Sequence, residues 1–325
     1  MENIKPTVAF FTCSNGYGHF KRVLEVAGHL QQDFCIDIYC EKFQYDKFKP
    51  LLKANFIFYK KPNIRWDFTI KSNKVDFDNY HNWIEYYGKE TQYYDYVISD
   101  NIVGLLKYRK DLILMGSFLW KDVFENKFGD NTLTKYDNKL LEKYNPTIIT
   151  NKYTETDSLV HYDNKVQFGF GCPHKQKVNY WDYYKTIVTV EPSLDYLSSY
   201  QECFDIIKTT CSKISELSTD INTINECVYV IRPGVGMLTH CVEHNIPIVA
   251  LYDPKDSSEI ITLAKLVEKL GIGIAHNTTN KQELVDGYFI AYKLNKFLSN
   301  RIYNKVELEK EGYENSAKYL RRLML

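Results

Sequence analysis

The sequence has no excess charge of either sign and no long apolar run. Its Lys and Arg residues number 41 and its Asp and Glu residues also number 41, so the formal net charge is zero. The bulk charge therefore does not indicate a nucleic acid or an anionic membrane as partner. No stretch approaches the roughly 20 apolar residues of a membrane span, and no apolar segment follows a basic start. We expect a soluble, cytoplasmic protein with no transmembrane segment.

Closely spaced cysteine pairs are also absent. The chain has eight cysteines, and none of them forms a C-x-x-C pair. Several lie in apolar segments, where a reduced thiol behaves as a small hydrophobic side chain. We therefore expect buried, reduced thiols.

The length of 325 residues suits two domains better than one core. The stretch Gly169–Pro173 contains two glycines and ends in proline, and it separates two halves that each contain predicted strands. We expect an N-terminal domain over residues 1–168 and a C-terminal domain over residues 169–300. The charged segment 301–325 is predicted to be a helix that crosses back to the N-terminal domain.

A glycine turn near the N-terminus joins a strand to a helix. Residues 7–11 are a short apolar run typical of a buried strand, and apolar residues recur at helical spacing over 23–30. Between them, Gly16 and Gly18 let backbone N–H groups approach a ligand closely at a helix start. His19 follows at the carboxyl end of the strand, where a base can act. The alternative is a tight turn with a histidine that only caps the helix.

Further apolar runs predict an α/β fold with parallel strands. In the first half we expect strands within 34–40, 56–59, 94–100, 111–116 and 146–150, and in the second half within 186–190, 227–231 and 246–251. Asp100 ends one of them, and carboxyl ends of parallel strands face the ligand crevice. Asp100 is thus a candidate partner for His19, with a helix N-cap as its alternative role. The polar piece 212–225 leaves little room for another strand.

The segment 65–94 is rich in aromatic residues and shows no clean period. We interpret it as an insertion at one end of the sheet. Its rings either stack on a sugar or another flat group, or pack on one another.

A second glycine turn lies in the C-terminal half. Arg232-Pro233-Gly234-Val235-Gly236 follows an apolar strand and opens a helix that runs to His244. The first N–H groups of that helix and its dipole suit a diphosphate.

Together the two turns resemble the GT-B glycosyltransferases, in particular the branch of the peptidoglycan N-acetylglucosaminyltransferase and the UDP-glycosyltransferase-like enzymes. The N-terminal part of the resemblance is the pattern G-x-G-H-x-x-R, from Gly16 to Arg22. The C-terminal part runs from Arg232 through Gly234 and Thr239 to Pro247, with a Gly-Ile-Gly ending at 271–273. The resemblance spans most of the chain.

The resemblance implies two Rossmann-like domains that face each other across a cleft. The C-terminal domain would hold a nucleoside-diphosphate sugar, with a UDP-sugar favoured. The N-terminal domain would hold a hydroxyl-bearing acceptor such as a glycan, a lipid-linked sugar or a small molecule. His19 would be the general base of an inverting transfer, and Asp100 would orient it. The helix start at Gly234 would stabilise the leaving diphosphate, so that neither a metal nor a cofactor is expected.

The residues assigned to the donor site come from both turns and from the segments after them. They are Gly16, Gly18, Ser193, Arg232, Gly234, Val235, Gly236, Met237, Thr239, His240, Glu243, Asp256 and Glu259. The acceptor-side candidates are Trp83, Ser117 and Trp120.

The sequence also departs from the family's pattern at the donor site. His240 stands where the family has a glutamate for the ribose hydroxyls, with Glu243 one turn later. Asp256 and Glu259 are the nearest substitutes for the Asp/Glu-Gln pair that binds the sugar. Two alternatives to transfer therefore stay open: a nucleotide-sugar hydrolase or epimerase of the same fold, and a binding protein without catalytic activity.

Overall fold

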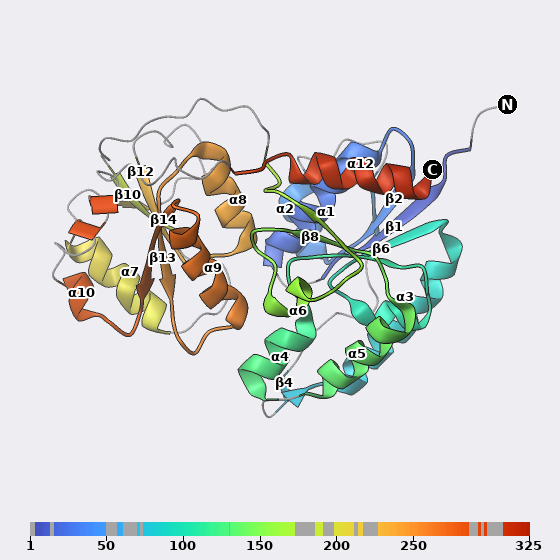
Figure 1. Cartoon of the computed structure of the whole chain (residues 1–325), viewed down its shortest axis with the longest axis horizontal. Coiled ribbons are helices and arrows are strands. Elements are labelled where there is room, and N and C mark those ends of the chain that lie inside the picture. Colours follow the sequence, from blue (N-terminus) through green and yellow to red (C-terminus); the bar gives the residue numbers. More distant parts are fainter. Residues whose placement is uncertain are drawn as a thin grey trace. The chain divides into compact units, whose positions relative to one another are not determined.

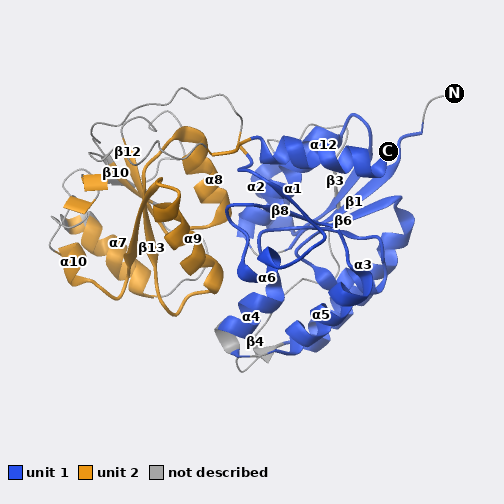
Figure 2. Cartoon of the chain, in the orientation of Figure 1, with its two compact units in different colours: residues 1–171, 311–325 blue, residues 172–310 orange. Residues whose placement is uncertain are grey.

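The chain forms two compact units, which Figure 2 shows in different colours. Unit 1 comprises Met1–Gly171 and Glu311–Leu325, and unit 2 comprises Cys172–Lys310. The sequence predicted that the domains divide after residues 168 and 300, whereas in the structure the units divide after Gly171 and after Lys310. The computed structural model describes residues 4–13, 16–49, 57–60, 70–71, 74–129, 131–172, 186–190, 198–210, 214–216, 227–285, 292–293, 296–297 and 308–325.

Unit 1 is built on a parallel sheet whose described strands lie in the order β3-β2-β1-β6-β7-β8-β9. The strands are β1 (Thr7–Phe11), β2 (Cys35–Tyr39), β3 (Ile57–Lys60), β6 (Tyr96–Asp100), β7 (Ile113–Met115), β8 (Ile148–Asn151) and β9 (Lys165–Phe168). The strand order reverses between β1 and β6, where both strands pair in parallel register. This reversal is the topological switch point at which open α/β sheets bind ligands.

Helices cover both faces of this sheet. They are α1 (Gly16–Leu30), α2 (Lys42–Phe48), α3 (Phe77–Glu90), α4 (Trp120–Phe128), α5 (Thr132–Tyr144), α6 (Asp157–Val160) and α12 (Gly312–Met324), with the 3-10 helices η2 (Thr91–Tyr93) and η3 (Val103–Lys107). Successive residues of β1 serve the two faces alternately. Phe10 packs in a cluster with α1 and α12, whereas Phe11 packs in a cluster with α3 and η3. A small antiparallel hairpin joins β4 (Ile70–Lys71) to β5 (Lys74–Val75).

The last helix of the chain packs on unit 1. Leu320 of α12 is fully buried in the same cluster as Leu30 of α1, and the two helices lie side by side (Figure 1). Arg321 donates from Nε to the Asp33 carboxylate at 2.6 Å and from Nη2 to the His29 carbonyl at 2.9 Å. The C-terminal segment thus completes the unit that the N-terminus begins.

Unit 2 contains a smaller parallel sheet with the order β11-β10-β12-β13-β14 among its described strands. The strands are β10 (Thr186–Val190), β11 (Ile214–Glu216), β12 (Cys227–Ile231), β13 (Ile248–Tyr252) and β14 (Gly273–Asn277). The helices are α7 (Ser198–Thr210), α8 (Val235–His244), α9 (Ser258–Lys269) and α10 (Gln282–Val285). The order reverses between β10 and β12, so unit 2 is also Rossmann-like.

The structure corrects three expectations. Residues 77–90, read as part of an aperiodic insertion, form the helix α3, whose N-cap Asp76 accepts the backbone N–H of Asn79 at 3.1 Å. The strands of unit 1 do not end at residue 150, because β9 follows β8 at the edge of the sheet. The polar piece 212–225 does hold a strand, since β11 pairs with β10.

Among the residues that the structure describes, no helix combines the length and the apolar character needed to cross a membrane. The described cysteines are all free thiols, as expected, and all but Cys35 are buried.

Candidate active site

The turn between β1 and α1 is held by a buried glutamine. Gln44 of α2 is fully buried and donates from Nε2 to the carbonyls of Cys13, at 2.9 Å, and Gly16, at 2.8 Å. Gly16 has φ +75°, a left-handed conformation that glycine adopts without strain. This turn fixes where α1 begins and therefore where the side chain of His19 lies.

His19 and Asp100 lie in contact at the switch point of the unit 1 sheet. His19 is in the first turn of α1, and its Nδ1 is 2.6 Å from Oδ2 of Asp100, the last residue of β6. The Asp100 side chain is completely buried, whereas 13% of the His19 side chain is exposed. The alternative N-cap role of Asp100 is not seen, because the N-cap of the following 3-10 helix is Ile102.

Arg22 is a third member of this cluster, and the sequence analysis assigned it no role. It lies one turn after His19 on α1, and its guanidinium pairs with Oδ1 of Asp100. Its Nη2 is 3.3 Å from Nδ1 of His19. The signal was the i, i+3 spacing of His19 and Arg22, which places both side chains on one face of the helix.

The ionised Asp100 fixes which nitrogen of His19 faces it as a donor. Burial alone would raise the pKa of Asp100, but Arg22 and His19 together lower it below its usual value. A carboxylate only accepts hydrogen bonds, so Oδ2 of Asp100 accepts the Nδ1–H of His19. In this arrangement Nε2 is the ring nitrogen turned away from Asp100 and is the candidate proton acceptor.

Aromatic rings border His19. The ring of Phe118 lies edge-on to His19 with centroids 5.8 Å apart, and the ring of Trp120, at the start of α4, lies 5.9 Å away. Ser117 is buried, and its hydroxyl accepts from Thr154 at 2.9 Å. Trp83 is a buried residue of α3, in the same core cluster as Phe118 and Trp120, and its ring packs on that of Tyr87. Of the three acceptor-side candidates, Trp120 is thus the one placed beside His19.

Asn101 follows Asp100 in a left-handed conformation, with φ +63°. Its backbone N–H donates to the Met115 carbonyl at 3.1 Å. Its side chain fills the space beside Gly116, where an added Cβ would lie 1.4 Å from the Asn101 amide oxygen. Asparagine tolerates this conformation better than most residues, and strained residues of this kind cluster at functional sites. Neither Asn101 nor Gly116 was predicted from the sequence to belong to the site.

In unit 2 the second glycine turn opens α8. Gly234 is the N-cap of α8, and as a glycine it provides no side chain to cap the helix. The residues Gly234 to Met237 are partly exposed. The first N–H groups of a helix have no partner within the helix, so those of α8 are available to an anion. The Thr239 hydroxyl donates back to the Val235 carbonyl at 2.8 Å, within the helix itself.

Two other donor-site candidates are paired with each other. Arg232 donates to both oxygens of Asp256 at 2.8 Å, and the Tyr200 hydroxyl donates to Oδ2 of Asp256 at 2.7 Å. Burial would raise the pKa of Asp256, but these donors and the Ser257 N–H lower it below its usual value. The pair positions the loop after β13. Glu259 follows Asp256 by three residues; it lies in the first turn of α9 and is partly exposed.

The remaining candidates of unit 2 lie along α8 or outside the described residues. His240 and Glu243 are partly exposed and lie toward the carboxyl end of α8, together with His244. Ser193 falls outside the residues that the structure describes.

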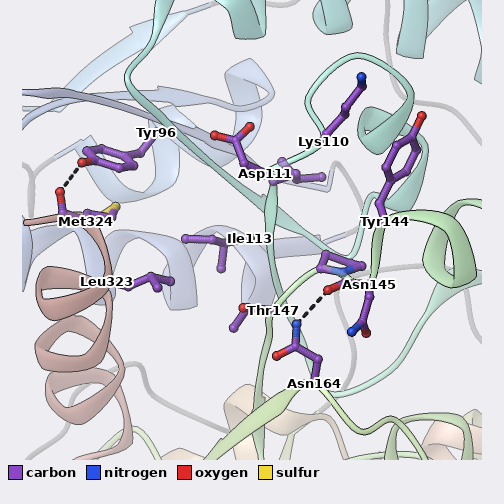
Figure 3. Close-up of a pocket in the computed structure, with 12 residues that line it drawn as sticks. Tyr96, Lys110, Asp111, Ile113, Tyr144, Asn145, Thr147, Asn164, Leu323 and Met324 are labelled. Atoms are coloured by element: carbon purple, nitrogen blue, oxygen red, sulfur yellow. Dashed lines mark hydrogen bonds between the residues drawn. The ribbon is translucent and has the colours of Figure 1, made fainter.

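A cavity of about 320 Å³ opens at the other end of the unit 1 sheet (Figure 3). It lies at the amino ends of β6, β7 and β8, and the bond from the Tyr96 hydroxyl to the Met324 carbonyl borders it. His19 and Asp100 lie at the carboxyl ends of the strands, so this cavity is separate from the candidate site.

No family model matches the sequence, and no curated protein matches it. Solved structures do match its fold. Arabidopsis thaliana UGT89C1 complexed with UDP-L-rhamnose has a TM-score of 0.63 at 9% identity, over 99% of this chain and 100% of that one. MurG of Acinetobacter baumannii has a TM-score of 0.62 at 11% identity, over 98% and 100%. Phytolacca americana UGT2, complexed with UDP-2-fluoro-glucose and pterostilbene, has a TM-score of 0.60 at 12% identity, over 98% and 100%. The chain therefore resembles the GT-B glycosyltransferases and has their fold of two Rossmann-like domains.

Proposed function

We propose that this chain is a glycosyltransferase that moves a sugar from a nucleoside-diphosphate sugar to the hydroxyl of an acceptor. The observation that carries the proposal is the contact of His19 with the buried, ionised Asp100 at the switch point of a GT-B N-terminal sheet. Two of the similar structures hold UDP-sugars or their analogues, which favours UDP as the nucleotide.

In the proposed reaction His19 is the general base. Its Nε2 takes the proton of the acceptor hydroxyl while the oxygen attacks the anomeric carbon. The bond from that carbon to the diphosphate oxygen breaks, and the diphosphate leaves with the electron pair. Attack from the face opposite the leaving group inverts the anomeric configuration. Asp100 stabilises the imidazolium that forms, and Arg22 keeps Asp100 ionised.

The start of α8 is the proposed site of the donor diphosphate. The N–H groups of Val235, Gly236 and Met237 and the positive end of the helix dipole suit the charge that grows on the leaving group. Backbone donors of this kind need no metal ion as a bridge, so we propose a metal-independent transfer.

The rings beside His19 favour an acceptor with a flat apolar face next to its hydroxyl. The rings of Trp120 and Phe118 lie close enough to the imidazole to contact such a group when its hydroxyl is bound at Nε2 of His19. The bound pterostilbene of the Phytolacca enzyme is an acceptor candidate to offer first, with glycans and lipid-linked sugars as further classes.

The first test is thermal stabilisation by UDP, dTDP, GDP, CDP and CMP and by their sugars, since a ligand of the folded state raises the unfolding midpoint. The proposal predicts a shift with one nucleoside diphosphate, with UDP favoured. Product is then sought by mass spectrometry with the matching sugar and a panel of phenolic and sugar acceptors. Rapid release of free sugar without any acceptor would instead identify a nucleotide-sugar hydrolase. No shift with any nucleotide contradicts the proposal.

A further inference from the structure

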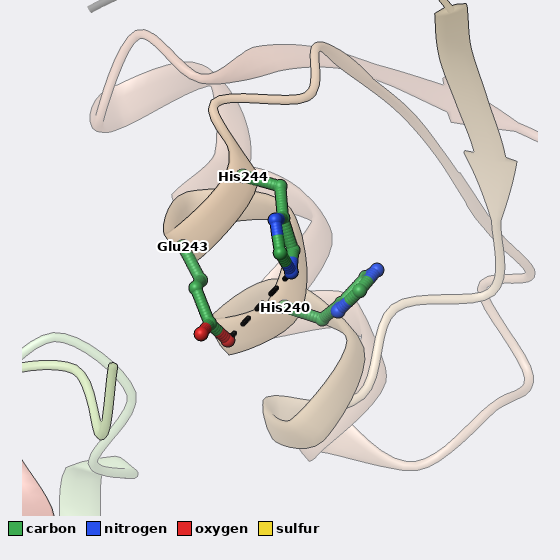
Figure 4. A group of neighbouring side chains, drawn as sticks. All are labelled: His240, Glu243 and His244. Atoms are coloured by element: carbon green, nitrogen blue, oxygen red, sulfur yellow. Dashed lines mark ion pairs between the residues drawn. The ribbon is translucent and has the colours of Figure 1, made fainter. Parts of the chain in front are cut away.

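We propose that His240, Glu243 and His244 form a binding site for a divalent transition-metal ion such as Zn²⁺. All three side chains project from α8 (Figure 4). One ligand atom of each lies within 4.8 Å of those of the other two. This inference does not rest on the proposed function, because it requires only the geometry of one helix.

The spacing of the three residues places them on one face of the helix. His240 and His244 are four residues apart, and Glu243 is three residues after His240, so their side chains are neighbours on the surface of α8. The rings of His240 and His244 lie 4.5 Å apart between centroids, and Nε2 of His244 is 4.0 Å from Oε2 of Glu243. His244 is therefore the neighbour of both other residues, between the His240 ring and the Glu243 carboxylate.

The ligand atoms lie close to the separations that a bound ion requires. Zinc bonds of about 2.1 Å to nitrogen and oxygen in tetrahedral geometry place ligand atoms roughly 3.4 Å apart. Nε2 of His244 and Oε2 of Glu243 are 4.0 Å apart, and the ligand atoms of all three residues lie within 4.8 Å of one another. The ring of Tyr229 on β12 stacks at 27° to His240, which limits the orientation of that imidazole.

The local field favours a cation. The three residues lie in the last turns of α8, which ends at the C-cap Asn245, and the carboxyl end of a helix carries partial negative charge. Glu243 adds a full negative charge. The His244 and Glu243 side chains are 20% and 29% exposed. An ion can therefore reach them from solvent, although most of each side chain is buried.

The ligand types select the metal. Two imidazoles and one carboxylate suit Zn²⁺, Co²⁺ or Ni²⁺, whereas Mg²⁺ and Ca²⁺ prefer oxygen ligands alone. Three protein ligands leave a fourth tetrahedral position for water or for an oxygen of a bound ligand. The ion would thus sit at the end of α8 opposite to Gly234, and the first N–H groups of the helix would remain available.

The test is calorimetric titration of the full chain, cleared of metal with EDTA, with ZnCl₂. We expect one Zn²⁺ per chain in the wild type. His240→Gln and His244→Gln, which keep a polar side chain of similar size, should each weaken binding about tenfold or more because each removes one ligand. His161→Gln, at an exposed histidine of unit 1, is the matched control and should bind as the wild type does.

A second measurement separates this site from the free cysteines. Co²⁺ bound to thiolate gives an intense near-ultraviolet charge-transfer band, whereas Co²⁺ bound to His and Glu gives only its visible bands. We expect the visible bands alone, and their loss in both α8 variants. Absence of binding, a thiolate band, or unchanged binding in both variants overturns the inference. Unfolding midpoints in EDTA check that the variants fold, and nucleotide binding measured in EDTA tests the proposed function independently.

Discussion

At the scale of single residues, the proposed chemistry concentrates on one nitrogen, Nε2 of His19. His19→Ala removes it, and loss of a general base typically costs about 10²-fold to 10⁴-fold in rate. We expect turnover to fall by at least about 10²-fold while the midpoint shift caused by the nucleotide sugar is retained, because the proposed donor contacts lie in unit 2. Turnover and thermal stabilisation measured on the same preparation check this, and an unchanged turnover would exclude His19 as the base.

Arg22 has a structural and a positioning role through Asp100. Arg22→Gln keeps one donor but removes the positive charge from beside a fully buried carboxylate. A buried group that loses its charged partner costs about 1–3 kcal/mol, so the free energy of unfolding should fall by that amount. The pKa of Asp100 should rise at the same time, so the low-pH limb of the activity profile should move to higher pH. Urea unfolding and the pH profile of turnover measure the two effects; an unmoved profile would leave Arg22 only a packing role.

Asp137 of α5 predicts a pH dependence of stability. Burial raises its pKa to about 8, although Lys121 and the Tyr80 hydroxyl act in the opposite direction. Because the folded-state pKa is above the unfolded value of about 3.9, the folded protein holds a proton that the unfolded chain releases between these pH values. The free energy of unfolding should therefore fall as pH rises from about 4 to about 8, by up to about 1.4 kcal/mol per pH unit.

Asp137→Asn removes this titration and should make the protein more stable than the wild type at pH 8. Urea unfolding at a series of pH values should give the variant a flatter curve between pH 5 and 8. Asp163→Asn, at an exposed aspartate of the same unit, is the control and should follow the wild-type curve. Parallel curves for wild type and Asp137→Asn would contradict the assignment.

At the scale of elements, α3 shows how an obvious pattern was missed. Its buried residues are Tyr80, Trp83, Ile84, Tyr87 and Gly88, which recur at helical spacing. Tyr86 lies outside this buried stripe and is also aromatic, so the aromatic content of 65–94 masked the period. The period was in the sequence. Of the two roles that the sequence left open for these rings, packing on one another holds for Tyr80, Trp83 and Tyr87, which lie in the core.

The glycines of two helices in unit 1 predict opposite effects of the same substitution. An added Cβ at Gly28 of α1 meets no atom within 4 Å, so Gly28→Ala should raise the free energy of unfolding by about 0.5–1 kcal/mol through helix propensity. At Gly88 of α3 the Cβ would lie 2.2 Å from the Tyr108 ring, so Gly88→Ala should lower it by about 1–3 kcal/mol. Denaturant unfolding of the two variants side by side measures the contrast. Destabilisation by both would contradict the packing of α1.

Two of the strands that sequence reasoning missed, β9 and β11, are short edge strands of the described sheets. Lys165-Val166-Gln167-Phe168 of β9 and Ile214-Ser215-Glu216 of β11 contain few apolar residues. Among the described strands, β9 pairs with β8 alone and β11 pairs with β10 alone, so neither needs the continuous apolar run of a central strand. The central strands β1, β6 and β12 have such runs, and all were predicted from them.

At the scale of the whole molecule, local patterns predicted the two Rossmann-like units. They predicted one partner of Asp100, His19, but not the partner of Asp256, Arg232. Asp100 was predicted beside His19 from strand order, whereas the pairing of Arg232 with Asp256 joins loops 24 residues apart through side-chain geometry that no local pattern specifies. Side-chain pairs between residues far apart in the sequence are thus the part of the site that could not be predicted from the sequence.

The docking of α12 on unit 1 predicts a position-dependent loss of stability. Leu320 is fully buried against the α1 side of the sheet, so Leu320→Ala should lower the free energy of unfolding of unit 1 by about 2–5 kcal/mol. Leu323, on the same helix, is 48% exposed, and Leu323→Ala should change it by no more than about 0.5 kcal/mol. Equal effects of the two substitutions would contradict the described packing of α12.

The return of the chain to unit 1 at Glu311 has a consequence for protein synthesis. Unit 2 is continuous, so all of its residues have been translated before α12 is made. Unit 1 begins translation first, yet the helix that packs in one cluster with Phe10 and Leu30 is made after all of unit 2. Domains commonly fold in the order in which they emerge. Here the N-terminal unit cannot complete that cluster until residues 312–324 have been made, and a nascent chain stalled before residue 311 would leave the α12-binding part of this face open to chaperones.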